Sequence, residues 1–296
     1  MREKFVDINF RPENLEKIHV INSVLSEYQA GGYDLTVRQV YYQMVARGYI
    51  ENSQRSYKRT ADLINNGRLA GLIDWDMIVD RGRVTVTPPA WKDPAEIVNI
   101  AANTFALDKW ADQPNHVEVM VEKQALEGVL IPVCRRLGIR FTANKGYSSS
   151  STMYETGNRL LNYLYDENKK VWVLYLGDHD PSGIDMTRDI EDRLNLFASR
   201  EVKVVRLALN MDQIQALNPP ENPAKETDSR YAAYITRFGY SSWELDALEP
   251  RTLDQIVTDA VISLRDEDLW SKTVALEESM RKELRGFVDN YYKGQD

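Results

Sequence analysis

The sequence predicts an α/β protein, in which a small helical module precedes a mostly parallel sheet. Segments typical of strands and of helices alternate between residues 116 and 209, which indicates βαβ units. A polar stretch near residues 108–115 separates them from a helix-rich first part. A hydrophobic content of 43% is enough for a proper core. We therefore divide the chain into residues 1–112 and 113–296.

The first part has the pattern of a winged-helix DNA-binding domain. A helix is predicted just after Thr36, because Thr36 and Gln39 have the spacing of a capping box and Gly48 is suited to the end. A second helix is expected over 56–66. Valines and threonines alternate over 84–87, which favours a short wing strand. Helix–turn–helix plus wing is our interpretation of residues 30–90.

The second part alternates between two periodicities. Each apolar, β-branched run is followed by a segment with helical spacing, so a crossover helix is expected after each strand. Residues 211–296 are expected to be mainly helical, with a proline-rich interruption at NPPENPAK. The strands are predicted at 116–122, 139–144, 171–177 and 202–209.

Composition narrows the class of protein. Cys134 is the only cysteine, which excludes an internal disulfide and a cysteine-based zinc cluster. No run approaches the ~20 apolar residues of a membrane span, and the N-terminus lacks the apolar region of a signal peptide. We expect a cytoplasmic protein without a membrane partner, associated with the nucleoid if the source is prokaryotic.

The distribution of charge indicates an anionic partner. The net charge of −8 argues against nucleic acid, yet residues 38–83 carry eight basic and five acidic side chains. This basic segment covers the predicted second helix. The residues expected to contact DNA phosphates there are Arg55, Lys58, Arg59 and Arg68.

Three carboxylates follow predicted strands. Glu122 ends the first strand of the sheet, and Asp178 and Asp180 follow the third. Ligands of parallel sheets bind beyond the carboxyl ends of the strands, and in extended backbone Asp178 and Asp180 point the same way while His179 points away. Three hard oxygen ligands favour Mg²⁺ or Mn²⁺. Such an ion can polarise a phosphoryl oxygen.

Other interpretations of these residues stay open. Asp180 followed by proline is also a good helix start, and Glu122 can cap a helix or form an ion pair. Glu244 and Asp246, in the segment WELDAL, can add a carboxylate to the site or simply occupy the first turn of a helix.

The motifs VEKQAL and LGDHDPSG resemble the TOPRIM domain of topoisomerases, primases and related nucleases over residues 115–210. The proline and glycine of DHDPSG are most similar to the topoisomerase VI A subunit and its meiotic relatives. The resemblance implies that Glu122 is an acid/base or metal-bridging group and that Asp178 and Asp180 bind the metal. The loop 144–152 lacks the family's proline, so Lys145 is either a phosphate contact or part of a solvent loop.

The segment VRQVYYQM resembles the helix that carries the nucleophilic tyrosine in the same family. The resemblance implies that Tyr42 attacks DNA, forms a 5′ link and works across a homodimer. Arg38 lies one helical turn before Tyr42, where a cation favours the ionised phenol, and Tyr41 lies on the apolar stripe. Alternatively, Tyr42 is an exposed aromatic on a DNA-contacting helix or the edge of a domain interface.

These observations support three hypotheses. The first is a topoisomerase VI A-like transesterase with Tyr42 as nucleophile and bound Mg²⁺ or Mn²⁺. The second is a TOPRIM nuclease that activates water, and the third is a non-catalytic DNA-binding subunit of a larger complex. The motif GxxxxGK[ST] is absent, so a topoisomerase of this kind needs a separate ATPase subunit.

Overall fold

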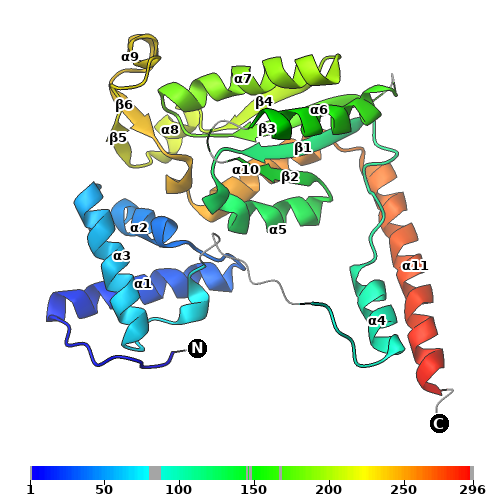
Figure 1. Cartoon of the computed structure of the whole chain (residues 1–296), viewed down its shortest axis with the longest axis horizontal. Helices are drawn as coiled ribbons and strands as arrows, with labels where there is room; N and C mark the ends of the chain where they lie inside the picture. The colour runs from blue at the N-terminus through cyan, green and yellow to red at the C-terminus, as the bar shows by residue number, and fades with distance from the viewer. Residues whose placement is uncertain (1, 80–87, 145, 147–148, 167–168, 294–296) are drawn as a thin grey trace.

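The computed structural model describes residues 2–79, 88–144, 146, 149–166 and 169–293. Its centre is a four-stranded sheet with helices on both faces (Figure 1). All neighbouring strands run parallel, in the order β2-β1-β3-β4. This confirms the predicted α/β class. The strands are β1 (Asn115–Val121), β2 (Arg140–Ala143), β3 (Lys170–Leu176) and β4 (Lys203–Ala208).

Alternate side chains of each strand point to opposite faces of the sheet, and helices bury both faces. Val119 and Leu174 pack on one face with helices α5 and α10, whereas Met120 and Tyr175 pack on the other with α6 and α7. Figure 1 shows these helix pairs on opposite sides of the sheet. The helices are α5 (Glu127–Leu137), α6 (Ser150–Leu164), α7 (Pro181–Ala198) and α10 (Pro250–Ser263).

The order of the strands creates a switch point between β1 and β3. The chain leaves β1 for β2 on one side and returns to β3 on the other. The crossover after β1 begins with a short 3-10 helix, η2 (Gln124–Leu126), before α5. The carboxyl ends of β1 and β3 are therefore adjacent, and the connections that follow them lead in opposite directions. Open α/β sheets bind ligands at such a switch point.

The N-terminal module consists of three helices around its own core. Helix α2 begins at the predicted capping box, in which Thr36 accepts from the amide of Gln39 and the Gln39 side chain accepts from the amide of Thr36. The predicted wing falls on residues 80–87, outside the described residues. The elements are α1 (Pro12–Ala30), α2 (Val37–Ala46), α3 (Gln54–Leu69) and the 3-10 helix η1 (Trp75–Met77).

A pair of helices extends from the body (Figure 1). Helix α4 (Pro94–Thr104) lies inside the segment assigned to the N-terminal domain, yet it packs against the last helix, α11 (Glu267–Lys293). Glu277 of α11 accepts from the amide of Leu107 at 2.9 Å and from Lys109 at 2.6 Å. These contacts join the segment after α4 to α11.

A two-stranded antiparallel sheet, formed by β5 (Glu221–Pro223) and β6 (Ser241–Trp243), interrupts the helical C-terminal part. The sequence predicts only a proline-rich break there. Helices α8 (Met211–Leu217) and α9 (Tyr231–Phe238) flank β5, and the 3-10 helix η3 (Leu245–Ala247) follows β6. Among the described residues, no helix combines the length and apolarity that crossing a membrane requires.

Candidate metal centre

Asp178 is positioned by the turn that follows β3. Its Oδ1 atom accepts a hydrogen bond from the amide of Leu245 at 2.8 Å. Gly177 precedes it because a side chain there has no room: a Cβ atom would lie 2.5 Å from the Tyr175 hydroxyl and 2.9 Å from Oε2 of Glu122. The carboxylate of Asp178 is consequently held at the end of the sheet and is almost fully buried.

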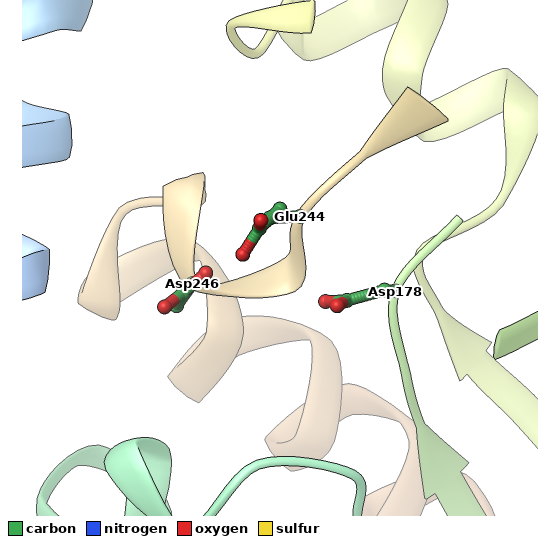
Figure 2. A group of neighbouring side chains, drawn as sticks. All are labelled: Asp178, Glu244 and Asp246. Atoms are coloured by element: carbon green, nitrogen blue, oxygen red, sulfur yellow. The ribbon is translucent and has the colours of Figure 1, made fainter. Parts of the chain in front are cut away.

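Strand β6 brings the second carboxylate to the same place. His179 and Trp243 exchange two backbone hydrogen bonds, of 2.8 and 3.0 Å, so the end of β6 runs beside the turn that carries Asp178. Glu244 is the next residue, and η3 then presents Asp246. Figure 2 shows the three side chains converging from these two segments.

The three carboxylates form the candidate centre. One oxygen of each can be chosen so that all lie within 4.8 Å of one another. Asp246 is 1% exposed and Asp178 is 7% exposed, whereas Glu244 is partly exposed. This spacing of carboxylate oxygens could hold a divalent ion, with water molecules completing its coordination.

Two cations contact the carboxylates. Lys123 Nζ lies 2.8 Å from Asp178 Oδ2, 2.5 Å from Glu244 Oε2 and 3.2 Å from Asp246 Oδ1. Arg38, from helix α2, pairs with Glu244 and places Nε 3.1 Å from Asp246 Oδ2. The N-terminal module therefore contributes a charge to the centre.

Burial and mutual repulsion shift the acidity of the group. Burial raises the pKa of Asp178 to about 7, and Lys123 opposes that shift. Burial likewise raises the pKa of Asp246. For Glu244 the burial effect is outweighed by Lys123 and Arg38, which hold its pKa below the ordinary value. The centre thus contains carboxylates that a positive ion stabilises in their charged form.

Glu122 and Asp180 lie close to Asp178 but outside the group of three carboxylates, and their expected role at the metal stays a prediction. Oε2 of Glu122 accepts from the amide of Asp178 at 2.8 Å, and burial raises the Glu122 pKa. Asp180 is the N-cap of α7 and accepts from the amide of Gly183 at 2.6 Å and from the Ser182 hydroxyl at 3.0 Å. The backbone of Asp180 is extended, as expected, with φ −139° and ψ 174°, and the helix begins at Pro181.

His179 points away from the carboxylates, as expected. Its Nδ1 atom lies 2.8 Å from the Tyr234 hydroxyl, and the imidazole is buried against Phe238 and Trp243. Burial lowers the pKa of His179 to about 4. The imidazole is therefore a neutral packing element of the loop.

Tyr42 is buried, although its place off the apolar stripe pointed outward. Tyr41 and Tyr42 are each 3% exposed and pack with Ala247 of η3. Arg38 lies over the Tyr42 ring, with Cζ 5.8 Å from the ring centroid. Burial, followed by the charges of Glu244 and Asp246, nevertheless raises the pKa of Tyr42 to about 12, so the expected activation by Arg38 is outweighed.

A small cavity of about 130 Å³ lies beside Tyr42 and Glu244. Arg38 and Tyr57 contribute to its wall from the N-terminal module, and Asn222 does so from β5. One molecule in liquid water takes up about 30 Å³, so the cavity has room for a few water molecules. It provides room for a small polar group beside Tyr42 and Glu244.

The predicted phosphate contacts have different surroundings. Arg55, Lys58 and Arg59 are exposed on α3. Arg68 is instead used internally: it donates to the carbonyl oxygens of Trp75 and Ile78. Its role as a phosphate contact stays a prediction. Lys145 lies outside the described residues.

Two residues at the centre, Lys123 and Arg206, were not predicted from the sequence. Lys123 directly follows Glu122, and that adjacency was a usable signal. Arg206 is a charged residue within the apolar strand β4; it donates to the carbonyl oxygens of Gly177 at 2.9 Å and Asp178 at 2.6 Å. Glu244 and Asp246 were noted only as additions, because their segment pairs with His179 through tertiary contacts.

No protein-family model matches this chain, and no curated protein matches it. The geometry of the carboxylate centre and the two motif resemblances are therefore the basis for a functional proposal.

Proposed function

We propose that this protein cleaves the phosphate backbone of DNA with a divalent metal ion bound at Asp178, Glu244 and Asp246. The observation that carries the proposal is the convergence of these carboxylates at the carboxyl end of β3, next to Arg38 and Tyr42. The resemblance to the TOPRIM domain and to the tyrosine-bearing helix supports the same chemistry.

The donor set fits Mg²⁺ or Mn²⁺. Both ions prefer carboxylate oxygens, and Oδ2 of Asp246 is buried without a hydrogen-bond donor, although Arg38 lies nearby. Asp178, Glu244 and Asp246 would hold the ion, and Glu122 would stay behind them as the acceptor for the Asp178 amide. When bound, the ion would polarise a phosphoryl oxygen and stabilise charge on the leaving oxygen.

The residues around the centre have distinct roles in this proposal. Arg206 holds the backbone of Gly177 and Asp178, which keeps the carboxylate in place. Arg38 offers a guanidinium to a scissile phosphate at the cavity beside Glu244. Exposed Arg55 and Lys58 on α3 would contact other phosphates and set affinity without selecting a sequence.

The nucleophile separates the two catalytic versions. In the transesterase version Tyr42 attacks phosphorus, acting on the centre of a partner subunit in a homodimer, as the resemblance implies. Tyr42 must then leave its packing against Ala247 and lose its proton. The second version uses water as nucleophile, and the burial of Tyr42 with its raised pKa favours it.

The test is a cleavage assay on supercoiled plasmid with the purified full chain, in Mg²⁺, in Mn²⁺ and in a chelator. We expect nicked or linear DNA with metal, and a loss of at least about 100-fold in Asp178→Ala, because removing a ligand of a charge-stabilising metal costs several kcal/mol. Asp192→Ala, at an exposed carboxylate of α7, is the matched control.

Tyr42→Phe and its control Tyr41→Phe decide between the versions. Covalent protein–DNA complexes that vanish only in Tyr42→Phe identify the transesterase. Cleavage that persists in Tyr42→Phe identifies the water nuclease. Full activity of Asp178→Ala, or no cleavage by the wild-type chain with either metal, contradicts the proposal. DNA binding without cleavage would favour a non-catalytic subunit, and a separate ATPase subunit is expected only for strand passage.

A further inference from the structure

The ammonium group of Lys123 occupies the place of a cation. It lies within 3.2 Å of an oxygen of each carboxylate in the centre, and the three oxygens belong to two segments that meet only in the fold. Only 22% of its side chain is exposed. A single lysine thus neutralises charge that Asp178, Glu244 and Asp246 would otherwise bury together.

We propose that Lys123 is a resident counter-ion that holds the carboxylate centre in the metal-free protein and has to withdraw before a divalent ion binds. This inference rests on the proposed metal-dependent function and adds regulation of metal binding to it. An ion held by the oxygens that Lys123 contacts would lie within a few ångströms of its ammonium group, so the two positive charges would repel each other strongly in this largely buried place.

The balance of charge supports an exchange. Among the described residues, the three carboxylates of the centre form ion pairs with two cations, Lys123 and Arg38, which leaves one negative charge in excess when all five groups are ionised. Replacing the single charge of Lys123 by the double charge of a metal removes that excess. Arg38 can remain, because it contacts Asp246 through Oδ2, whereas Lys123 uses Oδ1; the two cations share Oε2 of Glu244.

The lysine is the movable partner in this arrangement. Asp178 is fixed by the Leu245 amide, and its backbone is fixed by Arg206. Lys123 instead stands in the short link between β1 and η2, on a flexible four-carbon stem with part of its side chain at the surface. Withdrawal of Lys123 therefore requires rotation of one side chain and leaves the carboxylates where they are.

Competition by a resident cation lowers the apparent affinity for metal. The measured dissociation constant equals the intrinsic one divided by the fraction of protein whose site is free of Lys123. Removal of the ammonium group should therefore tighten metal binding without any new ligand. A lysine that merely stabilised the fold would have no such effect.

The first experiment measures Mn²⁺ binding to the full chain, by electron paramagnetic resonance of the free ion, for wild type, Lys123→Met and Lys109→Met. Lys109 is the matched control, since it also forms a largely buried pair, with Glu277, away from the centre. We expect at least about tenfold tighter binding in Lys123→Met only. Unchanged or weaker binding in Lys123→Met would overturn the inference.

A second experiment needs no variant and covers the case in which Lys123→Met fails to fold. The wild-type chain is treated briefly with an amine-acetylating reagent, with and without Mg²⁺, and acetylation of each lysine is followed by peptide mass spectrometry. We expect Mg²⁺ to speed modification of Lys123 several-fold and to leave Lys109 unchanged. Equal protection of Lys123 in both conditions would overturn the inference.

The two proposals fail in different ways. If the wild-type chain binds Mn²⁺ and cleaves DNA while Lys123 stays protected, only the counter-ion role is wrong. If neither the wild type nor Lys123→Met binds Mn²⁺, the metal-dependent function is wrong as well.

Discussion

Glu118 is a charged residue in the middle of buried strand β1, with 1% of its side chain exposed. Arg159 reaches it from α6 with two hydrogen bonds, of 3.1 and 2.7 Å, and His116 lies 3.1 Å away on the same strand. Burial alone would raise the pKa of Glu118, but the bonds from His116 and Arg159 outweigh it and hold the pKa below its ordinary value. The ionised form is therefore the one that the fold stabilises.

Arg159→Met should destabilise the fold by about 3 kcal/mol near neutral pH, because it leaves a buried carboxylate without its guanidinium. Glu118 with a lowered pKa contributes stability above its unfolded pKa of ~4.3, and this contribution is lost as the pH falls through the folded value. Without Arg159 the buried carboxyl takes a proton more readily, so the deficit should narrow toward pH ~4. Urea unfolding of both proteins near neutral pH and at pH ~4 measures this difference in the free energy of unfolding.

Arg188→Met is the control for that comparison. Arg188 is 63% exposed and pairs with Asp185 and Asp192 on the surface of α7, so its loss should leave the free energy of unfolding almost unchanged. A deficit in Arg159→Met that is the same at both pH values would show that lost packing, and not the charge of Glu118, causes it.

Helix α7 and the turn before it form the element that sets the centre. Asp180 caps the helix, Pro181 occupies its first turn, and Gly183 lies where the helix passes under the carbonyl group of Asp178. A Cβ atom at residue 183 would lie 2.2 Å from that carbonyl oxygen, and backbone cannot yield to it cheaply. The motif DHDPSG thus encodes a helix start packed directly against its preceding turn.

Gly183→Ala should therefore push the Asp178 backbone out of place and weaken Mn²⁺ binding by about tenfold or more. The same experiment on Gly286→Ala is the control. Gly286 lies within α11 with nothing within 4 Å of an added Cβ, so alanine there should leave metal binding unchanged and stabilise the helix by up to ~1 kcal/mol. Wild-type affinity in Gly183→Ala would mean that Asp178 does not depend on this packing.

Element prediction succeeded where local signals and burial agree. The apolar runs that became β1 and β3 are buried on both faces, and the capping box at Thr36 begins α2 as expected. The sheet β5–β6 was not predicted from the sequence, because its strands have three residues each. The strands are stabilised by pairing with each other and, through Trp243, with His179. Strands this short have too little periodicity to be recognised.

At the scale of the whole molecule, the N-terminal module contacts the α/β part at the carboxylate centre. Tyr41 and Tyr42 of α2 pack against Ala247 of η3, and Arg38 pairs with the carboxylates beside it. The same contact buries the proposed nucleophile and supplies a cation to the centre. Opening of this interface would change both features together.

Ala247→Arg should weaken the interface, because it places a long charged side chain between two buried rings. We expect hydrogen–deuterium exchange of residues 38–46 to become faster and Tyr42 to become reactive toward nitration. Ala233→Arg, at an exposed position of α9, should change neither. Unchanged exchange in Ala247→Arg would show that α2 is held by other contacts.

The α/β class, the parallel strands and the position of Asp178 after β3 could be predicted from the sequence. They depend on hydrophobic periodicity and turn chemistry, which are local properties of the chain. Only the tertiary structure decided which carboxylates meet Asp178. Glu244 and Asp246 reach it through the pairing of Trp243 with His179. Lys123 and Arg38 then occupy the centre because buried negative charge requires nearby positive charge, and local sequence carries no record of which distant residues supply it.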